Sequence, residues 1–165
     1  MLMTFQILNI TPLPLPLSAD TSFLPSASAA RALLDSPQGK ATKAIVLVTP
    51  NNPTGATYPS ALIDEFADLA RERRVALIVD ETYRDFLVPG DTNDDPAVPA
   101  RPHALFDRPD WRDHVISLSS FSKSYKIPGH RLGMIVAGQE VLQAVTKVAD
   151  SIQVRHPLSP LVVPG

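Results

Sequence analysis

Cysteine is absent from this sequence, which therefore has no disulfides, no thiolate nucleophile and no cysteine-ligated metal. Histidine is scarce too, and none of the four stands at metal-ligand spacing from another. We therefore expect no metal centre. A cytoplasmic protein is compatible with this composition.

An excess of charge of one sign is also lacking. The 15 basic and 17 acidic residues leave a formal net charge of −2, which gives no electrostatic reason to expect nucleic acid or an acidic membrane surface as a partner. Apolar runs never approach the roughly 20 residues of a membrane span. The 165 residues are enough for one domain with a hydrophobic core.

Proline, by contrast, is plentiful, with 17 residues. The prolines crowd into 12–16, 89–109 and 157–164, where they indicate loops, since proline cannot continue a helix or donate to a sheet. The alternation of Pro and Leu in 11–17 is typical of an extended edge segment.

Between these loops, β-branched runs alternate with helical periodicity. The runs predict strands over 44–48, 75–80, 114–120 and 131–138, and the periodicity predicts helices over 28–34, 60–74 and 139–152. A strand, a helix and a strand in this order indicate a βαβ crossover. The fold class we predict is α/β, with a mainly parallel sheet and helices on both faces.

Specialised polar segments follow three of the predicted strands. They are Asn51-Asn52-Pro53-Thr54-Gly55, the segment from Asp80 to Tyr83, and the segment from Ser119 to Lys123. Because ligands of open α/β sheets bind beyond the carboxyl ends of the strands, we expect these segments to converge on one crevice.

These segments, in this order, resemble the class I/II aminotransferases, which are fold-type I pyridoxal-phosphate enzymes. The motifs are NNPTG, DETY and SFSKSYKIPGHRLG, and the resemblance covers roughly residues 13–152. It implies a three-layer α/β fold, pyridoxal 5'-phosphate as cofactor, and an amino acid and a 2-keto acid as substrates. It also implies a homodimer for the full-length family.

The resemblance assigns a role to each matching residue. Lys123 corresponds to the lysine that forms a Schiff base with the cofactor aldehyde and moves the substrate proton. Asp80 corresponds to the carboxylate that pairs with the pyridine nitrogen. Tyr83 and Asn52 correspond to the pair that hydrogen-bonds the phenolic oxygen.

Three further residues match the part of the family's site that binds the phosphate. Ser120 and Ser122 would offer hydroxyl groups to it. Arg131, eight positions after Lys123, would offer a guanidinium that can bind a dianion bidentately.

Taken alone, each of these residues has a simpler interpretation. Asn52 suits a turn, Asp80 suits a helix cap and Tyr83 suits the core. The serines and Lys123 suit a solvated loop, and Arg131 suits an ion pair. One cofactor explains them together, which favours the catalytic interpretation.

The sequence departs from the family mainly in length, since family subunits are more than twice as long. We expect residues 1–165 to form part of the large, cofactor-binding domain, with its N-terminal part and the C-terminal small domain absent. Two alternatives stay open. The chain could derive from a pyridoxal-phosphate C–S lyase of the same fold, or it could be a truncated, non-catalytic remnant or weak cofactor-binding module. An unrelated binding module is the remaining class.

Overall fold

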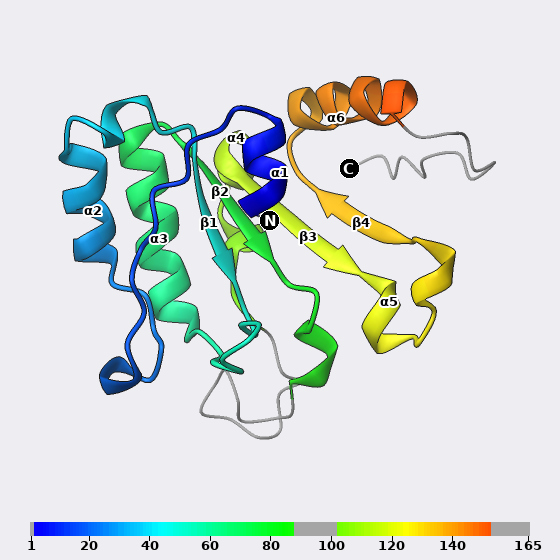
Figure 1. The fold of residues 1–165 in the computed structure, drawn as a ribbon, viewed down its shortest axis with the longest axis horizontal. Helices are drawn as coiled ribbons and strands as arrows, with labels where there is room; N and C mark the ends of the chain where they lie inside the picture. The colour runs from blue at the N-terminus through cyan, green and yellow to red at the C-terminus, as the bar shows by residue number, and fades with distance from the viewer. Residues whose placement is uncertain (1, 88–101, 153–165) are drawn as a thin grey trace.

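A four-stranded mixed sheet forms the centre of the protein (Figure 1). The computed structural model describes residues 2–87 and 102–152. Strand order follows chain order, and the strands are β1 (Ala44–Val48), β2 (Ala76–Asp80), β3 (Val115–Ser120) and β4 (Gly133–Val136). The first three strands are parallel and β4 is antiparallel to β3, so the prediction of a mainly parallel sheet is confirmed.

The longer helices lie close to their predicted positions. They are α2 (Ala27–Asp35), α3 (Ser60–Arg73) and α6 (Gln139–Ile152), and short helices occur at α1 (Leu2–Ile7), α4 (Trp111–His114) and α5 (Phe121–Ser124). Residues 11–17 pair with no strand, so their prediction as an edge segment is wrong. Of the Pro- and Asp-rich excursion predicted over 88–109, residues 88–101 lie outside the described residues, as does the tail beyond Ile152. The described part is not exposed throughout, as an excursion would be, because His103 and Leu105 are buried.

Helix α3 makes the crossover between the parallel strands β1 and β2. It follows Pro59 and ends at Arg74, whose φ of 54° breaks the helical repeat. The apolar residues repeat every three to four positions, which places them on one face. That face buries Ile63, Phe66, Ala67, Leu69 and Ala70.

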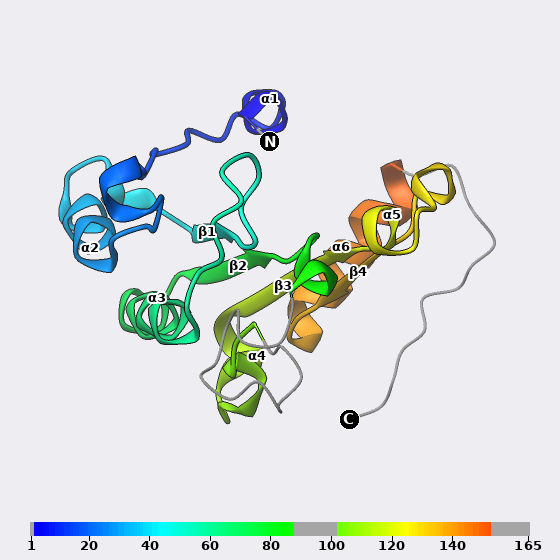
Figure 2. The same ribbon diagram turned by 90° about the horizontal axis from the view of Figure 1, so that it is seen from below.

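The hydrophobic core lies between α3 and one face of the sheet. Phe66 and Ile63 from α3 meet Leu77 and Val79 from β2, and all four are fully buried. Burying one such side chain stabilises a fold by roughly 1.5–3 kcal/mol. Figure 2 shows α4 on the same side of the sheet as α3, where Leu105 and Val115 extend the core.

Alternate residues of the strands point to the other face, which is less well covered. Val46 on β1 and Ile135 on β4 are exposed on that face. Helix α6 has an apolar stripe but no buried residue. Among the described residues the sheet is therefore packed on one face and largely open on the other, an incomplete form of the three-layer arrangement. No helix in the described part of the chain combines the length and apolarity needed to cross a bilayer.

The register brings the carboxyl ends of the parallel strands to one edge. Val48 lies opposite Asp80, and Asp80 lies opposite Leu118. On the other side of β3, Ser120 lies opposite Gly133. The loops that follow β1, β2 and β3 thus leave the sheet together, at the lower edge in Figure 1.

Candidate functional site

The loop after β1 is organised by Asn51 rather than by Asn52. The Asn51 side-chain amide donates to the Val48 carbonyl at 3.2 Å, and its oxygen accepts from the Thr54 hydroxyl at 2.8 Å. Asn52 is exposed, and its side chain makes no hydrogen bond with any described residue. Asn52 lies within this turn, as the turn interpretation predicts, but Asn51 makes the side-chain hydrogen bonds that hold it.

Asp80 ends β2 with its carboxylate half-buried. Its Oδ1 accepts from the Thr82 backbone N–H at 3.1 Å and from the Thr82 hydroxyl at 2.7 Å. Asp80 therefore does not cap the 3-10 helix Arg84–Phe86, whose N-cap is Tyr83, but closes a local turn with one oxygen only. No described residue donates to Oδ2, which is left for another donor.

Tyr83 follows in the same turn and is half-buried. Its ring lies 6.0 Å from the ring of Phe86, measured between centroids. Phe86 is itself 61% exposed, so this pair is not part of the core. The Tyr83 hydroxyl has no hydrogen-bond partner among the described residues.

The segment after β3 forms the single turn of α5. Ser120 caps this turn, because its hydroxyl accepts from the Ser122 N–H at 3.2 Å. The Ser122 hydroxyl and the Lys123 amine have no partner among the described residues, and Lys123 is exposed. The free hydroxyl and the free amine are thus held one position apart on a short, capped helix.

Arg131 returns to the same place by way of a tight turn. Its φ is 51°, and its Nη1 donates to the Pro128 carbonyl at 3.1 Å. The Phe121 N–H donates to the Leu132 carbonyl at 3.2 Å, which ties the start of α5 to the residue after Arg131. The residue after Arg131 is therefore held against the first residue of α5, and Arg131 itself is exposed.

Asn52 is the most distant member of the set along the sheet edge. Neighbouring strands lie about 4.8 Å apart, so the loop after β1 stands roughly 10 Å from the end of β3, with Asp80 between them. A hollow of about 320 Å³ adjoins the β3 end and is lined by Ser120, Phe121, Tyr125, Arg84, Asp85, Ser119 and Met134. Its lining does not include Asp80 or Lys123.

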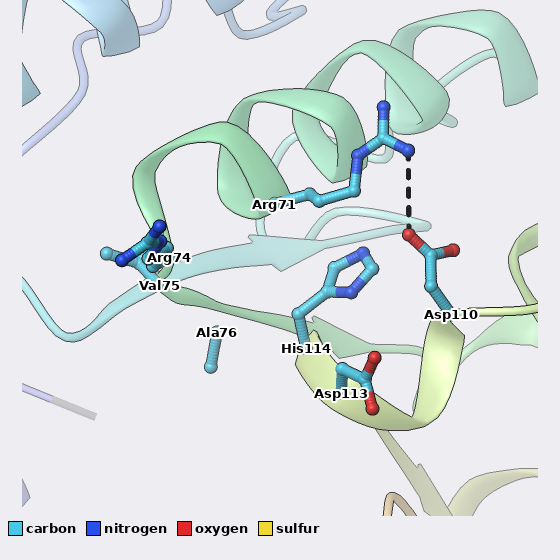
Figure 3. A pocket seen from close by; sticks show the side chains of 7 residues that line it. All are labelled: Arg71, Arg74, Val75, Ala76, Asp110, Asp113 and His114. Carbon is cyan, nitrogen blue, oxygen red and sulfur yellow. Dashed lines mark ion pairs between the residues drawn. The ribbon is translucent and has the colours of Figure 1, made fainter.

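A second hollow, of about 360 Å³, lies at the opposite end of the sheet (Figure 3). Ala76, the first residue of β2, and His114, just before β3, are part of its wall. Arg71 Nη1 and Asp110 Oδ2 form an ion pair across it at 3.6 Å. This hollow is therefore remote from the predicted site residues.

A buried polar cluster beside the site was not predicted from the sequence. Glu81 is completely buried, and its Oε2 accepts from the Ser117 hydroxyl at 2.5 Å. Nε2 of His103 lies 3.3 Å from Oε1, without the alignment of a hydrogen bond. The sequence did hold a signal for Glu81, since it continues the alternation of Leu77 and Val79 toward the core.

The environment of Glu81 favours its charged form. Burial raises the pKa of the carboxyl, but His103, Ser117 and the Arg84 guanidinium together outweigh burial. The pKa of Glu81 therefore lies below its ordinary value of 4.5. His103 Nδ1 accepts from the Leu105 N–H at 3.3 Å, which assigns the ring proton to Nε2, facing Glu81.

We predict that Glu81 makes folding stability dependent on pH in the acid range. A carboxyl with a lowered pKa binds fewer protons when folded, so its contribution is complete above 4.5 and is lost as the pH falls through the folded value. Unfolding by urea at a series of pH values should show this loss in the unaltered chain. Glu81→Gln should flatten that part of the profile, whereas an equally steep profile in the variant would contradict the prediction.

Comparison with known proteins gives a consistent result. The family profile described as Aminotransferase class I and II matches residues 1–164. An aspartate aminotransferase of Sulfurisphaera tokodaii is 34% identical over 119 residues, which are 72% of this chain and 27% of that protein. An aspartate aminotransferase of Pyrococcus horikoshii is 32% identical over 143 residues, which are 87% of this chain and 33% of that protein.

The fold has solved counterparts as well. A double mutant of Thermus thermophilus aspartate aminotransferase superposes with a TM-score of 0.73 at 26% identity, covering 89% of this chain and 34% of that one. The chain spans between a quarter and about a third of the length of the curated relatives it matches. Because the family profile matches the chain along nearly the whole of the chain's length, the chain belongs to the class I and II aminotransferase family.

Proposed function

We propose that this chain is part of a pyridoxal-phosphate-dependent aminotransferase, which moves an amino group between an amino acid and a 2-keto acid. The observation that carries the proposal is a group of polar side chains at one sheet edge. The side chains of Asn52, Tyr83, Ser122 and Lys123 have no partner among the described residues, and Asp80 keeps Oδ2 free. Relatives named aspartate aminotransferase and aromatic amino acid aminotransferase support the substrate class.

The donor set fits the ring of this cofactor. The free Oδ2 of Asp80 would pair with a protonated pyridine nitrogen, and Thr82 fixes the orientation of that carboxylate through Oδ1. The Tyr83 hydroxyl and the Asn52 amide would donate to the phenolic oxygen. When bound, the cofactor supplies an electron-withdrawing ring next to the substrate α-carbon.

The donor set also fits the phosphate. Ser120 and Ser122 offer hydroxyl groups from a capped turn, and Arg131 offers N–H groups that its bond to Pro128 does not use. A dianion is matched by one cation and several donors, and charge-assisted hydrogen bonds of this kind are stronger than neutral ones.

Lys123 supplies the side chain that would transfer the substrate proton. Its Nζ is the amine suited to the cofactor aldehyde, and it would take up and return the proton of the substrate α-carbon. The exposure of Lys123 supports a second candidate, a weak cofactor-binding module without turnover, because water has free access to this amine.

The location of the cofactor tests the proposal directly. We would incubate the purified chain with a modest amount of pyridoxal phosphate, reduce it with borohydride and map the adduct by mass spectrometry. The proposal requires the adduct on Lys123. An assay for 2-keto acid formation from an amino acid then separates transfer from elimination, because only transfer needs an acceptor keto acid. Labelling spread evenly over Lys40, Lys43, Lys126 and Lys147 would contradict a built site.

A carboxylate substitution gives a graded test of the same site. Asp80→Ala should weaken pyridoxal phosphate binding by roughly 10- to 100-fold, because one charged hydrogen bond is worth about 1.5–3 kcal/mol. Equilibrium dialysis measures the change. Asp113→Ala, which removes an exposed carboxylate at the opposite end of the sheet, is the control and should leave affinity unchanged.

We extend the proposal to the setting of the chain. Residues 1–165 would correspond to part of the large, cofactor-binding domain, since the chain spans between a quarter and about a third of its relatives' length. A homodimer and a cytoplasmic location belong to the same proposal, the latter supported by the lack of cysteine.

A further inference from the structure

We infer that Glu81 is a positioning residue for the turn that carries Asp80 and Tyr83. Its side chain, on the core side of the sheet, anchors this turn to β3 and to the segment around His103. This inference deepens the proposed function and rests on it for its catalytic meaning. The anchoring itself is a property of the described structure and can be tested without cofactor.

The burial of Glu81 needs an explanation beyond packing. Its side chain is completely buried, as are the apolar neighbours Leu77 and Val79 on the same face of β2. A buried carboxylate is costly unless it is paired, and an apolar residue of similar volume often packs as well or better. The partners of the carboxylate therefore indicate what the charge contributes.

Those partners come from separate parts of the chain. Ser117 on β3 donates to Oε2 at 2.5 Å, and His103 approaches Oε1 at 3.3 Å. Arg84 Nη1 lies 3.7 Å from the same Oε1. The carboxylate thus joins β3, the segment before α4 and the turn after β2.

The backbone of Glu81 makes a second link in the same direction. Its N–H donates to the Leu118 carbonyl at 2.8 Å, one residue beyond Ser117. Its own carbonyl accepts from the Arg84 N–H at 3.0 Å, which closes the turn around Thr82 and Tyr83. With side chain and backbone both held, rotation or translation of this turn against β3 is restricted.

The position of Glu81 transfers this restraint to the site residues. It stands between Asp80 and the Thr82–Tyr83 pair, and its side chain points to the core while Asp80 points to the opposite face. The residues of β3 that Glu81 contacts, Ser117 and Leu118, are followed two positions later by Ser120 and then by α5. Glu81 therefore sets the relative placement of the ring-binding residues and the phosphate-binding residues without contacting the ligand.

Two sets of variants of the 165-residue chain test the inference. Glu81→Gln keeps the shape and removes the charge, and Glu81→Met combined with Ser117→Ala removes the carboxylate together with its buried donor. Glu65→Gln on the exposed side of α3 is the matched control. Hydrogen exchange of the cofactor-free chain follows the hydrogen-bonded amides of position 81, Thr82 and Arg84, and equilibrium dialysis follows pyridoxal phosphate affinity.

We expect hydrogen exchange to rise at these three amides in both sets of variants, while the amides of α3 keep their protection. We expect the affinity for pyridoxal phosphate to fall by about 10-fold, as at sites that lose an outer supporting partner. A purely structural role predicts recovery of both readouts in the Met and Ala combination. Unchanged exchange at the three amides, or a change equal throughout the chain, would overturn the inference.

If the unaltered chain fails to bind pyridoxal phosphate, the proposed function fails, and exchange alone decides the role of Glu81. Should the combined variant not fold, Glu81→Gln decides by the same exchange criterion.

Discussion

Replacement of Lys123 by alanine is expected to abolish reducible attachment of pyridoxal phosphate and to lower aminotransferase activity by about 10³-fold or more. The amine is the group that matches the aldehyde, and a positioned proton-transfer group alone contributes roughly 10²- to 10⁴-fold. No described residue bonds to the Lys123 amine, so its removal leaves no buried group unpaired. The fold should therefore survive, and the loss should be chemical.

Borohydride trapping with mass spectrometry and a coupled keto-acid assay measure these two effects. Lys126→Ala is the matched control, because Lys126 is exposed and lies only three positions further along the same loop. Its adduct yield should equal that of the unaltered chain. Retention of specific labelling or of turnover after Lys123→Ala would refute both the assigned role and the proposed function.

Replacement of Phe66 by alanine is expected to destabilise the chain by about 3–5 kcal/mol, which is a large part of the stability of a typical domain. Phe66 is completely buried and packs in the cluster that contains Ile63 and Leu77. Its removal leaves a cavity between α3 and the sheet, and one face of that sheet is already open. We therefore expect the variant to be largely unfolded at 37 °C.

Circular dichroism during urea and thermal unfolding gives the measurement. Phe86→Ala is the control, since Phe86 is 61% exposed and should cost less than about 1 kcal/mol. Equal destabilisation by the two substitutions would mean that the core does not lie between α3 and the sheet.

Local chemistry was sufficient to predict most elements of this fold. The run at 44–48 and the periodic segment at 139–152 coincide with β1 and α6 because β-branched residues and amphipathic spacing act within a few residues. Helix α1 was not predicted, since one and a half turns carry little periodicity. Residues 11–17 form no helix, but they are not an edge segment of the sheet, because pairing needs a neighbouring strand and the fold decides which strands are neighbours.

The candidate site likewise has features that the sequence predicted and features that it did not. The sequence by itself determined the residue types, their order and the family, because NNPTG, DETY and SFSK are local segments whose chemistry can be read without coordinates. Only the tertiary structure decided that Asn51 rather than Asn52 organises the first loop, and that Asp80 keeps one oxygen free. It alone decided that Glu81 joins Ser117 and His103, because contacts between residues tens of positions apart depend on strand register and packing, which no local pattern encodes.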